Sequence, residues 1–183
     1  MTGTDLLSGG HPVTLEELLL AREKRATRQR QALNYYRLPL ISFSLVAPGA
    51  VKNSPVWQRV AGYAVKEIGA ICQRMAWASV WEKHTDERSG AEWMAAVCAP
   101  AKLLKQHMSQ LELQHSLGRL WDIDVIDSDG RLLSRRELQL PARQCLICQQ
   151  DAHVCARSRQ HACELLLDEI ARRIECYERQ YIG

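Results

Sequence analysis

An alternating run in the second half of the chain constrains most strongly how this protein can fold. In "LWDIDV", the apolar residues Trp121, Ile123 and Val125 are separated by Asp122 and Asp124. Successive side chains of a β-strand point to opposite faces, so the pattern predicts a strand with one apolar face against a core. Both aspartates then share the other face, where they repel each other unless a proton or a cation lies between them.

The segments around this strand predict an α+β protein. Apolar spacing and turn residues indicate a helix over 13–37, a strand within 38–49, a helix from Ser54, a hairpin over 77–99, a helix from Pro100, the strand already described, a further strand over 131–138 and a closing helix from Cys163. A βαββαβ core between added N-terminal and C-terminal helices is typical of a split-βαβ, ferredoxin-like fold with a mostly antiparallel sheet.

The size and charge of the chain limit the remaining choices. Its 183 residues suit a single domain over 1–183, divided into a flexible lead (1–12), a basic helix (13–37), a sandwich core (38–140) and a Cys-rich loop with the C-terminal helix (141–183). A net charge of +3 is too small to argue for nucleic acid or an anionic membrane. We see no secretory signal and no apolar run of about 20 residues, so we expect a cytoplasmic protein and no membrane partner.

The first helix carries a capping signal and a basic face. Thr14 with Glu17 three residues later forms a capping-box pattern. The second half of the helix carries a basic face made of Arg22, Lys24, Arg25, Arg28 and Arg30. Two interpretations stay open: a solvated face with cations placed favourably toward the helix C-terminus, or a surface that faces phosphates or a protein partner.

The aspartate pair indicates a magnesium site. Two carboxylates at i and i+2 of a strand offer oxygen ligands to Mg²⁺, which proteins commonly share with substrate phosphates. The candidate phosphate-binding residues around the pair are Gly118, Arg119, Arg135 and Arg136. The alternative is that the aspartates form salt bridges with neighbours such as Arg119 or Arg135.

A second constellation lies in "CLICQQDAHVCARSRQH". Cys145, Cys148, Cys155 and His161 match a closed tetrahedral zinc site, which is typically structural. His153 competes as the fourth ligand, and Asp151 is a weaker candidate. A redox role is disfavoured because no thioredoxin-like pattern surrounds the CxxC. Free thiols packed around a loop are the other interpretation.

A third segment, "APGAVKNSP", joins the first strand to the second helix. Lys52 and a helix start at Ser54 could present an ammonium and backbone amides to phosphates. An ordinary strand–turn–helix joint is the favoured interpretation of this segment.

Taken together, three segments resemble one known family. "LPLISFSLVAPGAVKNS", "LGRLWDIDVIDSDGRLLSRRELQLPARQCLIC" and "VCARSRQH" are similar to the apo-citrate lyase phosphoribosyl-dephospho-CoA transferase family, also called CitX or citrate lyase holo-[acyl-carrier protein] synthase. The resemblance implies nucleotidyl-type transfer of 2′-(5″-triphosphoribosyl)-3′-dephospho-CoA to a serine of the citrate lyase acyl carrier protein, the gamma subunit. Diphosphate is released.

The residues then suggest roles in such a reaction. Asp122 and Asp124 would hold Mg²⁺ against the triphosphate, and Arg119 with Arg135 or Arg136 would neutralise the leaving diphosphate. Asp124 or His115 would accept the proton of the carrier serine, and the sequence does not choose between them.

A basic helix around Arg22, Arg25 and Arg28 would dock an acidic carrier protein. The rival hypothesis from another class is a non-enzymatic, zinc-stapled module that binds RNA or a protein partner. The low net charge and the lack of an aromatic stacking platform argue against it.

Overall fold

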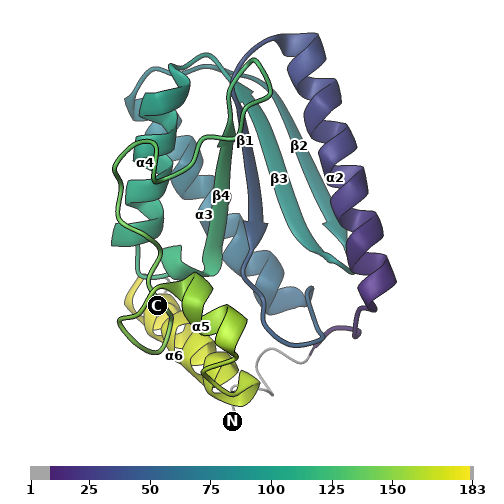
Figure 1. Cartoon of the computed structure of the whole chain (residues 1–183), viewed down its shortest axis with the longest axis vertical. Helices are drawn as coiled ribbons and strands as arrows, with labels where there is room; N and C mark the ends of the chain where they lie inside the picture. The colour runs from purple at the N-terminus through teal and green to yellow at the C-terminus, as the bar shows by residue number, and fades with distance from the viewer. Residues whose placement is uncertain (1–8, 182–183) are drawn as a thin grey trace.

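A four-stranded antiparallel sheet forms the centre of the protein in a computed structural model that describes residues 9–181 (Figure 1). The elements, in chain order, are α2 (Leu15–Tyr36), β1 (Leu40–Leu45), α3 (Pro55–Arg74), β2 (Ser79–Glu87), β3 (Gly90–Val97), α4 (Ala101–Gln114), the 3₁₀ turn η1 (Gly118–Leu120), β4 (Trp121–Ile126), α5 (Ala152–Ser158) and α6 (Cys163–Tyr181). The predicted α+β class is confirmed. Within residues 9–181, none of the helices has both the length and the apolar character that crossing a membrane requires.

The strand order places β1 and β4 side by side, although α3, β2, β3 and α4 lie between them in the sequence. The order is β2-β3-β1-β4, and every neighbouring pair is antiparallel. Phe43 of β1 lies opposite Trp93 of β3 on one side and Ile123 of β4 on the other. This register puts the apolar residues of three strands on one face of the sheet.

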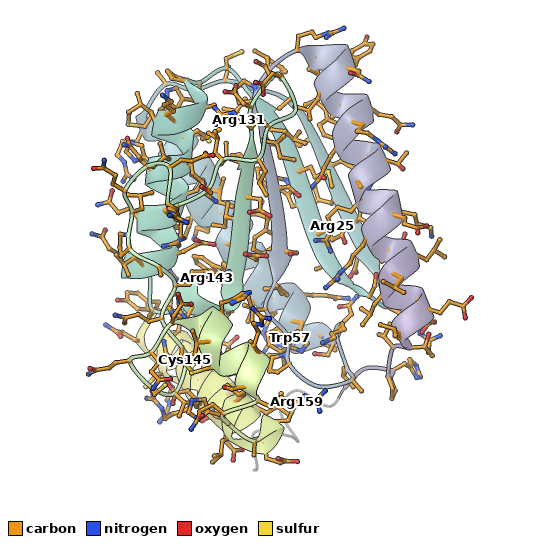
Figure 2. All side chains as sticks on the ribbon, in the orientation of Figure 1. Arg25, Trp57, Arg131, Arg143, Cys145 and Arg159 are labelled. Atoms are coloured by element: carbon orange, nitrogen blue, oxygen red, sulfur yellow. The ribbon has the colours of Figure 1, made fainter. Side chains whose placement is uncertain are left out.

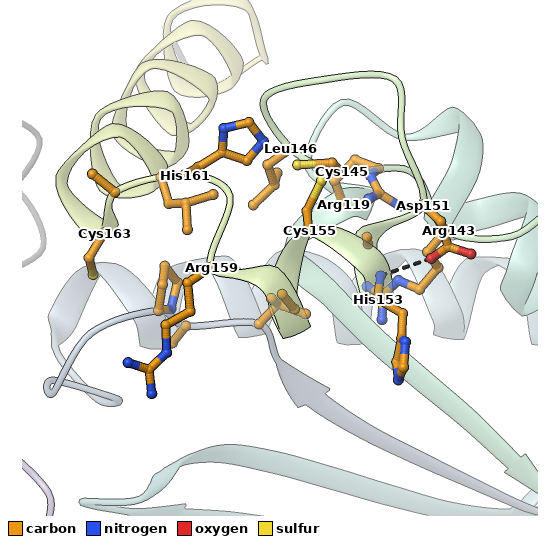
Figure 3. A pocket seen from close by; sticks show the side chains of 17 residues that line it. Arg119, Arg143, Cys145, Leu146, Asp151, His153, Cys155, Arg159, His161 and Cys163 are labelled. Atoms are coloured by element: carbon orange, nitrogen blue, oxygen red, sulfur yellow. Dashed lines mark hydrogen bonds between the residues drawn. The ribbon is translucent and has the colours of Figure 1, made fainter.

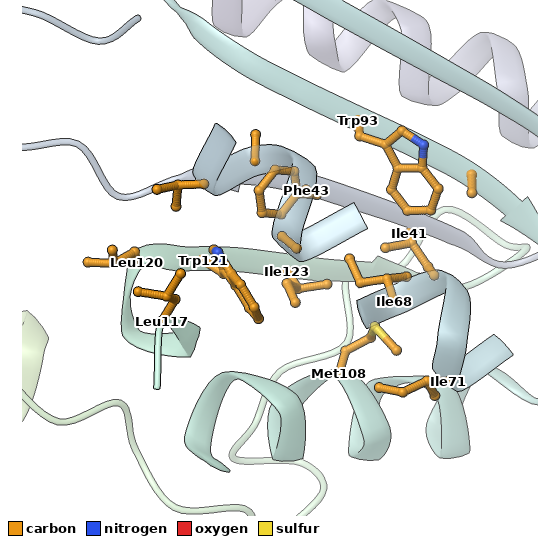
Figure 4. Packing of buried hydrophobic residues seen from close by; sticks show 14 of the residues in the cluster. Ile41, Phe43, Ile68, Ile71, Trp93, Met108, Leu117, Leu120, Trp121 and Ile123 are labelled. Atoms are coloured by element: carbon orange, nitrogen blue, oxygen red, sulfur yellow. The ribbon is translucent and has the colours of Figure 1, made fainter. Parts of the chain in front are cut away.

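That apolar face packs against α3 and α4 and forms the main core (Figure 4). Its fully buried side chains include Phe43, Trp57, Ile68, Met108 and Trp121. Burying each such side chain stabilises the fold by roughly 1.5–3 kcal/mol. The alternation predicted for β4 is confirmed, because its odd-numbered residues are buried in this core.

The opposite face of the sheet is partly covered by α2, which contacts β3 and β1. Figure 1 shows this helix at the β2–β3 side of the sheet. The capping box predicted at the start of α2 is confirmed: Thr14 accepts from Glu17 N, and the Glu17 carboxylate accepts from Thr14 N. Toward its end α2 contributes Ala32 and Leu33 to a small apolar cluster around Met94. The other half of this face is polar, which leaves room there for a functional site.

Strand β4 lies at the sheet edge, and two buried side chains of α4 cover its free backbone groups. Lys105 Nζ donates to Ile123 O at 2.9 Å, and Glu112 Oε1 accepts from Ile123 N at 2.8 Å. Both side chains are almost completely buried. Edge strands otherwise expose such groups to further pairing, so α4 ends the sheet here and fixes the position of β4.

The strand predicted over 131–138 is not formed. Only a single bridge joins Ile126 to Leu132, and the chain then turns, with Glu137 N donating to Ser134 Oγ at 3.2 Å. Leu133 alone of this segment is buried. The region predicted as a Cys-rich loop also contains the short helix α5, whose start is capped by Asp151. Of the predicted lead, residues 1–8 lie outside the described part, and Pro12 bridges to Val51.

Candidate functional site

The two aspartates of β4 lie on the polar face of the sheet, as the alternation predicts. Asp122 is opposite Ser44 of β1 in the register, and Asp124 is opposite Ser42. Each aspartate side chain is 45% exposed, so both carboxylates reach solvent and remain accessible to a ligand. Burial and the neighbouring Asp122 carboxylate raise the pKa of Asp124, as expected for two like charges on one strand face.

Each aspartate faces a cation. Arg143 Nη1 donates to Asp122 Oδ1 at 2.6 Å, and Arg143 Nη2 donates to the carbonyl oxygen of Trp121. Lys105 Nζ lies 3.8 Å from Asp124 Oδ1. In both pairs the cation contacts Oδ1 of the aspartate, and among the described residues no cation donates a hydrogen bond to the Oδ2 atom. The carboxylates are therefore held in place and can still accept a further cation.

Two arginines of the basic face predicted on α2 pair with a buried glutamate instead of facing solvent. Arg25 Nε donates to Glu92 Oε1 at 2.8 Å, and Arg28 Nη2 donates to Glu92 Oε2 at 2.5 Å. Glu92 is buried on β3, so these two cations are used to attach α2 to the sheet (Figure 2 labels Arg25). Arg22 is exposed and stays outside this pair.

A small polar cavity of about 230 Å³ lies between α2, the hairpin turn and the end of β1. It collects four of the predicted site residues from separate parts of the chain: Arg22, Arg25, Lys52 and Asp122. Lys52 Nζ donates to Ala47 O at 2.5 Å. Burial lowers the pKa of Lys52, and the nearby Arg22 charge lowers it further, whereas Cys163 opposes the shift.

Figure 3 shows a second, large cavity, which has a volume of about 900 Å³. Its walls are α5, the start of α6 and the loop after β1, and Ala47 lines both cavities. Most of its surface is apolar, with the guanidinium groups of Arg119, Arg143 and Arg159 among its lining. Burial and the charges of Arg143, Arg135 and Arg173 lower the pKa of Arg119, so positive charge is concentrated at this wall.

The predicted cysteine and histidine ligands come together at the same wall. One donor atom from each of Cys145, Cys148, Cys155 and His161 lies within 4.8 Å of the others. Cys148 Sγ is 3.5 Å from Cys155 Sγ and 3.4 Å from His161 Nε2. We call these four residues the Cys/His cluster. A metal ion could bind at it, and the structure brings in His161 rather than the alternative His153 as the fourth member.

The thiols of the cluster differ in acidity. Burial and hydrogen bonds with Cys148 and Cys145 raise the pKa of Cys155 to about 12. The pKa of Cys145 is lowered: burial raises it, but hydrogen bonds, those from the backbone N–H groups of Cys148 and Ile147 foremost, lower it by more. The pKa of the Cys145 thiol is therefore lower than that of the Cys155 thiol.

Other predicted site residues lie apart from the aspartates or have structural contacts. His115 stacks on Trp121 with ring centroids 4.4 Å apart, on the core side of β4, and burial lowers its pKa. A Cβ on Gly118 would lie 2.5 Å from Glu112 O, so this glycine allows close packing against α4. Arg135 binds the buried Glu112 carboxylate and also donates to Pro141 O. Arg136 is exposed.

Sequence reasoning missed the residues that link the site together. Arg143 is the most important of them, because it contacts Asp122 and also lines the large cavity. Glu92, Lys105 and Glu112 are the others, each an ionisable side chain buried by tertiary contacts. The seven-residue spacing of Lys105 and Glu112 does place both on one face of α4 and was an available signal.

The site as a whole defines a class of protein. Paired carboxylates, several cations and a large, mostly apolar cavity fit an enzyme that transfers a phosphorylated group from a partly apolar donor. The family model for apo-citrate lyase phosphoribosyl-dephospho-CoA transferase, CitX, matches residues 13–177, so the chain belongs to the CitX family.

Individual relatives agree with this assignment. A protein of Shigella flexneri serotype 5b (strain 8401), named apo-citrate lyase phosphoribosyl-dephospho-CoA transferase, is 41% identical over 164 residues, which are 90% of each chain. A protein of Escherichia coli (strain SE11) with the same name has the same identity and coverage.

Proposed function

We propose that this chain is a holo-[acyl-carrier protein] synthase that attaches a phosphoribosyl-dephospho-CoA group to the acyl carrier subunit of citrate lyase. The donor is 2′-(5″-triphosphoribosyl)-3′-dephospho-CoA. Family membership supports the reaction. The observation in the structure that carries it is the position of Asp122, at the junction of a cationic cavity and a large apolar cavity.

The bond changes follow from the donor. The hydroxyl oxygen of the carrier serine attacks the phosphorus attached to the ribosyl C5″ oxygen, and the bond from that phosphorus to the diphosphate breaks. Charge develops on the leaving diphosphate, so cations near it stabilise the transition state. Arg119 remains our candidate for this role, whereas the binding of Glu112 by Arg135 makes Arg135 less available than predicted.

The proton of the serine goes to a base on the chain. Asp124 lies on the same face of β4 as Asp122, while His115 stacks on Trp121 on the other face. This placement favours Asp124 over His115. Gly118, Arg136, Arg22, Arg25 and Lys52 remain predicted contributors to donor binding.

Asp122 and Asp124 fit a magnesium ion. Both are half-exposed on one strand face. Burial and the neighbouring Asp122 charge raise the pKa of Asp124, and a divalent cation would offset both effects. When bound, such an ion supplies charge stabilisation to phosphate oxygens. Asp122 and Asp124 would be its protein ligands.

The Cys/His cluster fits zinc. Three thiols and one imidazole are the donor set of closed structural zinc sites, which are tetrahedral and leave no position for substrate. Cys145 and Cys148 precede α5, Cys155 lies within it and His161 follows it. We therefore infer that zinc, when bound, holds α5 against the segment before it and has no catalytic role.

Three broader assignments are also proposals. The strand order with α3 and α4 on one sheet face supports a split-βαβ, ferredoxin-like arrangement. One continuous main core supports a single domain. The seven cysteines, all free thiols, are consistent with a reducing, cytoplasmic location.

An intact-mass assay tests the proposed function. The purified protein is incubated with the triphosphoribosyl donor, Mg²⁺ and the apo form of the citrate lyase carrier subunit. The carrier should gain the mass of one phosphoribosyl-dephospho-CoA group, and a carrier variant with its acceptor serine replaced by alanine should gain nothing. An unchanged mass of the unaltered carrier would reject the proposal and favour the binding-module alternative.

A further inference from the structure

The charges around the small cavity are not balanced. Its carboxylates are Glu92 and Asp122, and both already have partners, because Arg25 and Arg28 bind Glu92 and Arg143 binds Asp122. Within residues 9–181, no ion pair involves Arg22 or Lys52.

These two cations also lie close enough to affect each other. Arg22 and Lys52 line the same small cavity. Burial lowers the pKa of Lys52, the Cys163 thiol opposes this shift, and the Arg22 charge adds to it. Lys52 is fixed by its hydrogen bond to Ala47 O, and Arg22 of α2 lines the same cavity. A compact anion between the two would relieve the repulsion.

The walls of the small cavity suit such an anion. Ser89 and Gly90 of the β2–β3 turn complete the lining next to Lys52. Gly90 has φ 124°, and a Cβ there would lie 3.4 Å from Lys52 O, so the turn approaches the lysine closely because this residue is glycine. The volume of about 230 Å³ accommodates linked phosphates but not a nucleotide with a long organic arm.

The large cavity has the complementary character. Its volume of about 900 Å³ and the apolar side chains of Val46, Leu146 and Leu166 suit a base and an extended organic arm. The cavities meet at Ala47, with the Asp122–Arg143 pair beside the junction.

We propose that the two cavities divide the donor between them: the small cavity binds its terminal linked phosphates through Arg22 and Lys52, and the large cavity binds its dephospho-CoA part. This inference rests on the proposed function for the identity of the donor. It assigns the leaving phosphates to Arg22 of α2 and Lys52 of the loop after β1. These two residues replace Arg135, Arg136 and also Arg119 in that role, because Arg119 lines the large cavity and not the small one.

Two separate probes test this division. Calorimetric titrations measure the affinity of the full-length protein for inorganic diphosphate and for dephospho-CoA, in buffer without added divalent metal. Arg22→Gln and Lys52→Met should each weaken diphosphate binding about 10- to 100-fold, the size expected for a lost charge-assisted hydrogen bond, and leave dephospho-CoA binding unchanged. Lys52→Arg, which keeps the charge, should retain most of the affinity and shows whether the pocket itself still forms.

The reverse effect is expected in the large cavity. Leu166→Trp fills space at its wall and should weaken dephospho-CoA binding at least about tenfold without changing diphosphate binding. Matched controls are Arg30→Gln on α2, Lys66→Met on α3 and Leu165→Trp on α6, which are exposed and line neither cavity. They should bind both probes normally.

The outcomes separate this inference from the proposed function. Unchanged diphosphate affinity in both Arg22→Gln and Lys52→Met would overturn the inference, even if the unaltered protein modifies the carrier in the intact-mass assay. If the probes bind as expected but no carrier is modified, the division into two subsites stands and the proposed reaction fails.

Discussion

Arg143, labelled in Figure 2, donates a hydrogen bond to Asp122 Oδ1 at 2.6 Å and so connects the segment before the Cys/His cluster to the aspartate strand. The same guanidinium also binds the carbonyl oxygen of Trp121. Because Arg143 O accepts from Ala152 N at 2.8 Å, its backbone is attached to the start of α5 as well. One residue thus fixes the orientation of Asp122 relative to both cavities.

Replacing Arg143 should therefore impair transfer more than folding. Arg143→Ala removes the cation that orients Asp122, and we expect kcat/KM for carrier modification to fall about 100-fold. Arg143→Lys should recover only part of this loss, because a single ammonium cannot reproduce the two-pronged contact. Steady-state kinetics with Arg157→Ala, an exposed neighbour on α5, as the control would measure the effect. Equal rates for Arg143→Ala and the control would remove Arg143 from the site.

The aspartate pair should be essential to transfer but not to the fold. Asp122→Asn and Asp124→Asn remove the negative charge expected to hold a cation, and each should reduce transfer by at least about 1,000-fold. Their far-ultraviolet circular dichroism should be unchanged, because both side chains are half-exposed. Asp129→Asn in the turn after β4 is the matched control and should remain active. Activity retained in either strand variant would exclude that residue from catalysis.

Local patterns predicted a large part of this structure. The alternation around Ile123 gave the strand and the shared face of the aspartates, and the pairing of Thr14 with Glu17 gave the start of α2. The spacing of Cys145, Cys148 and Cys155 indicated a clustered site. These features depend on contacts within a few residues or on a single strand face, which sequence spacing reports directly.

The remaining features depend on tertiary contacts. Nothing near Arg143 indicates that it reaches Asp122, and the sequence around Glu92 does not show that this strand residue pairs with α2. The strand predicted over 131–138 failed because the segment buries only Leu133, and a strand without a further partner gains too little by pairing. The start of α5 did carry a signal, since Asp151 is a favourable N-cap residue.

His115 should affect the pH dependence of stability rather than catalysis. Burial lowers its pKa in the folded chain, so over the range between that lowered value and the ordinary histidine value the unfolded chain binds more protons. Stability should therefore decrease as the pH falls through this range. His115→Phe keeps a ring against Trp121 and should flatten this dependence in thermal unfolding measured at several pH values. Loss of transfer in a folded His115→Phe protein would instead support His115 as the base.

The Cys/His cluster should bind one zinc ion per chain. Elemental analysis of the purified protein measures it directly, and Cys148→Ser should reduce the content nearly to zero because one of the four ligands is lost. The Tm of that variant should also decrease, since metal binding adds to folding free energy. Cys176→Ser, an exposed thiol of α6 outside the cluster, should keep both metal and Tm. A zinc-free unaltered protein with the same Tm after chelation would contradict the assignment.

The Glu112–Arg135 pair should contribute to stability rather than to donor binding. Glu112 is 2% exposed, and its carboxylate accepts a hydrogen bond from Ile123 N at 2.8 Å and also binds Arg135. Arg135→Met would therefore leave the buried Glu112 charge without its partner. The free energy of unfolding should fall by about 3–5 kcal/mol, the cost of breaking a buried pair from one side. Arg179→Met disrupts an exposed pair with Glu175 on α6 and should cost less than about 1 kcal/mol.

Denaturant unfolding measures both variants. If Arg135→Met were as stable as the unaltered chain and instead bound inorganic diphosphate poorly, Arg135 would face the donor, as the sequence first suggested. The double variant Glu112→Leu/Arg135→Met removes both charges of the pair. It should restore part of the stability lost in Arg135→Met, because no unpaired charge then remains buried. Ile123 N would still lack its acceptor, so the recovery should be incomplete.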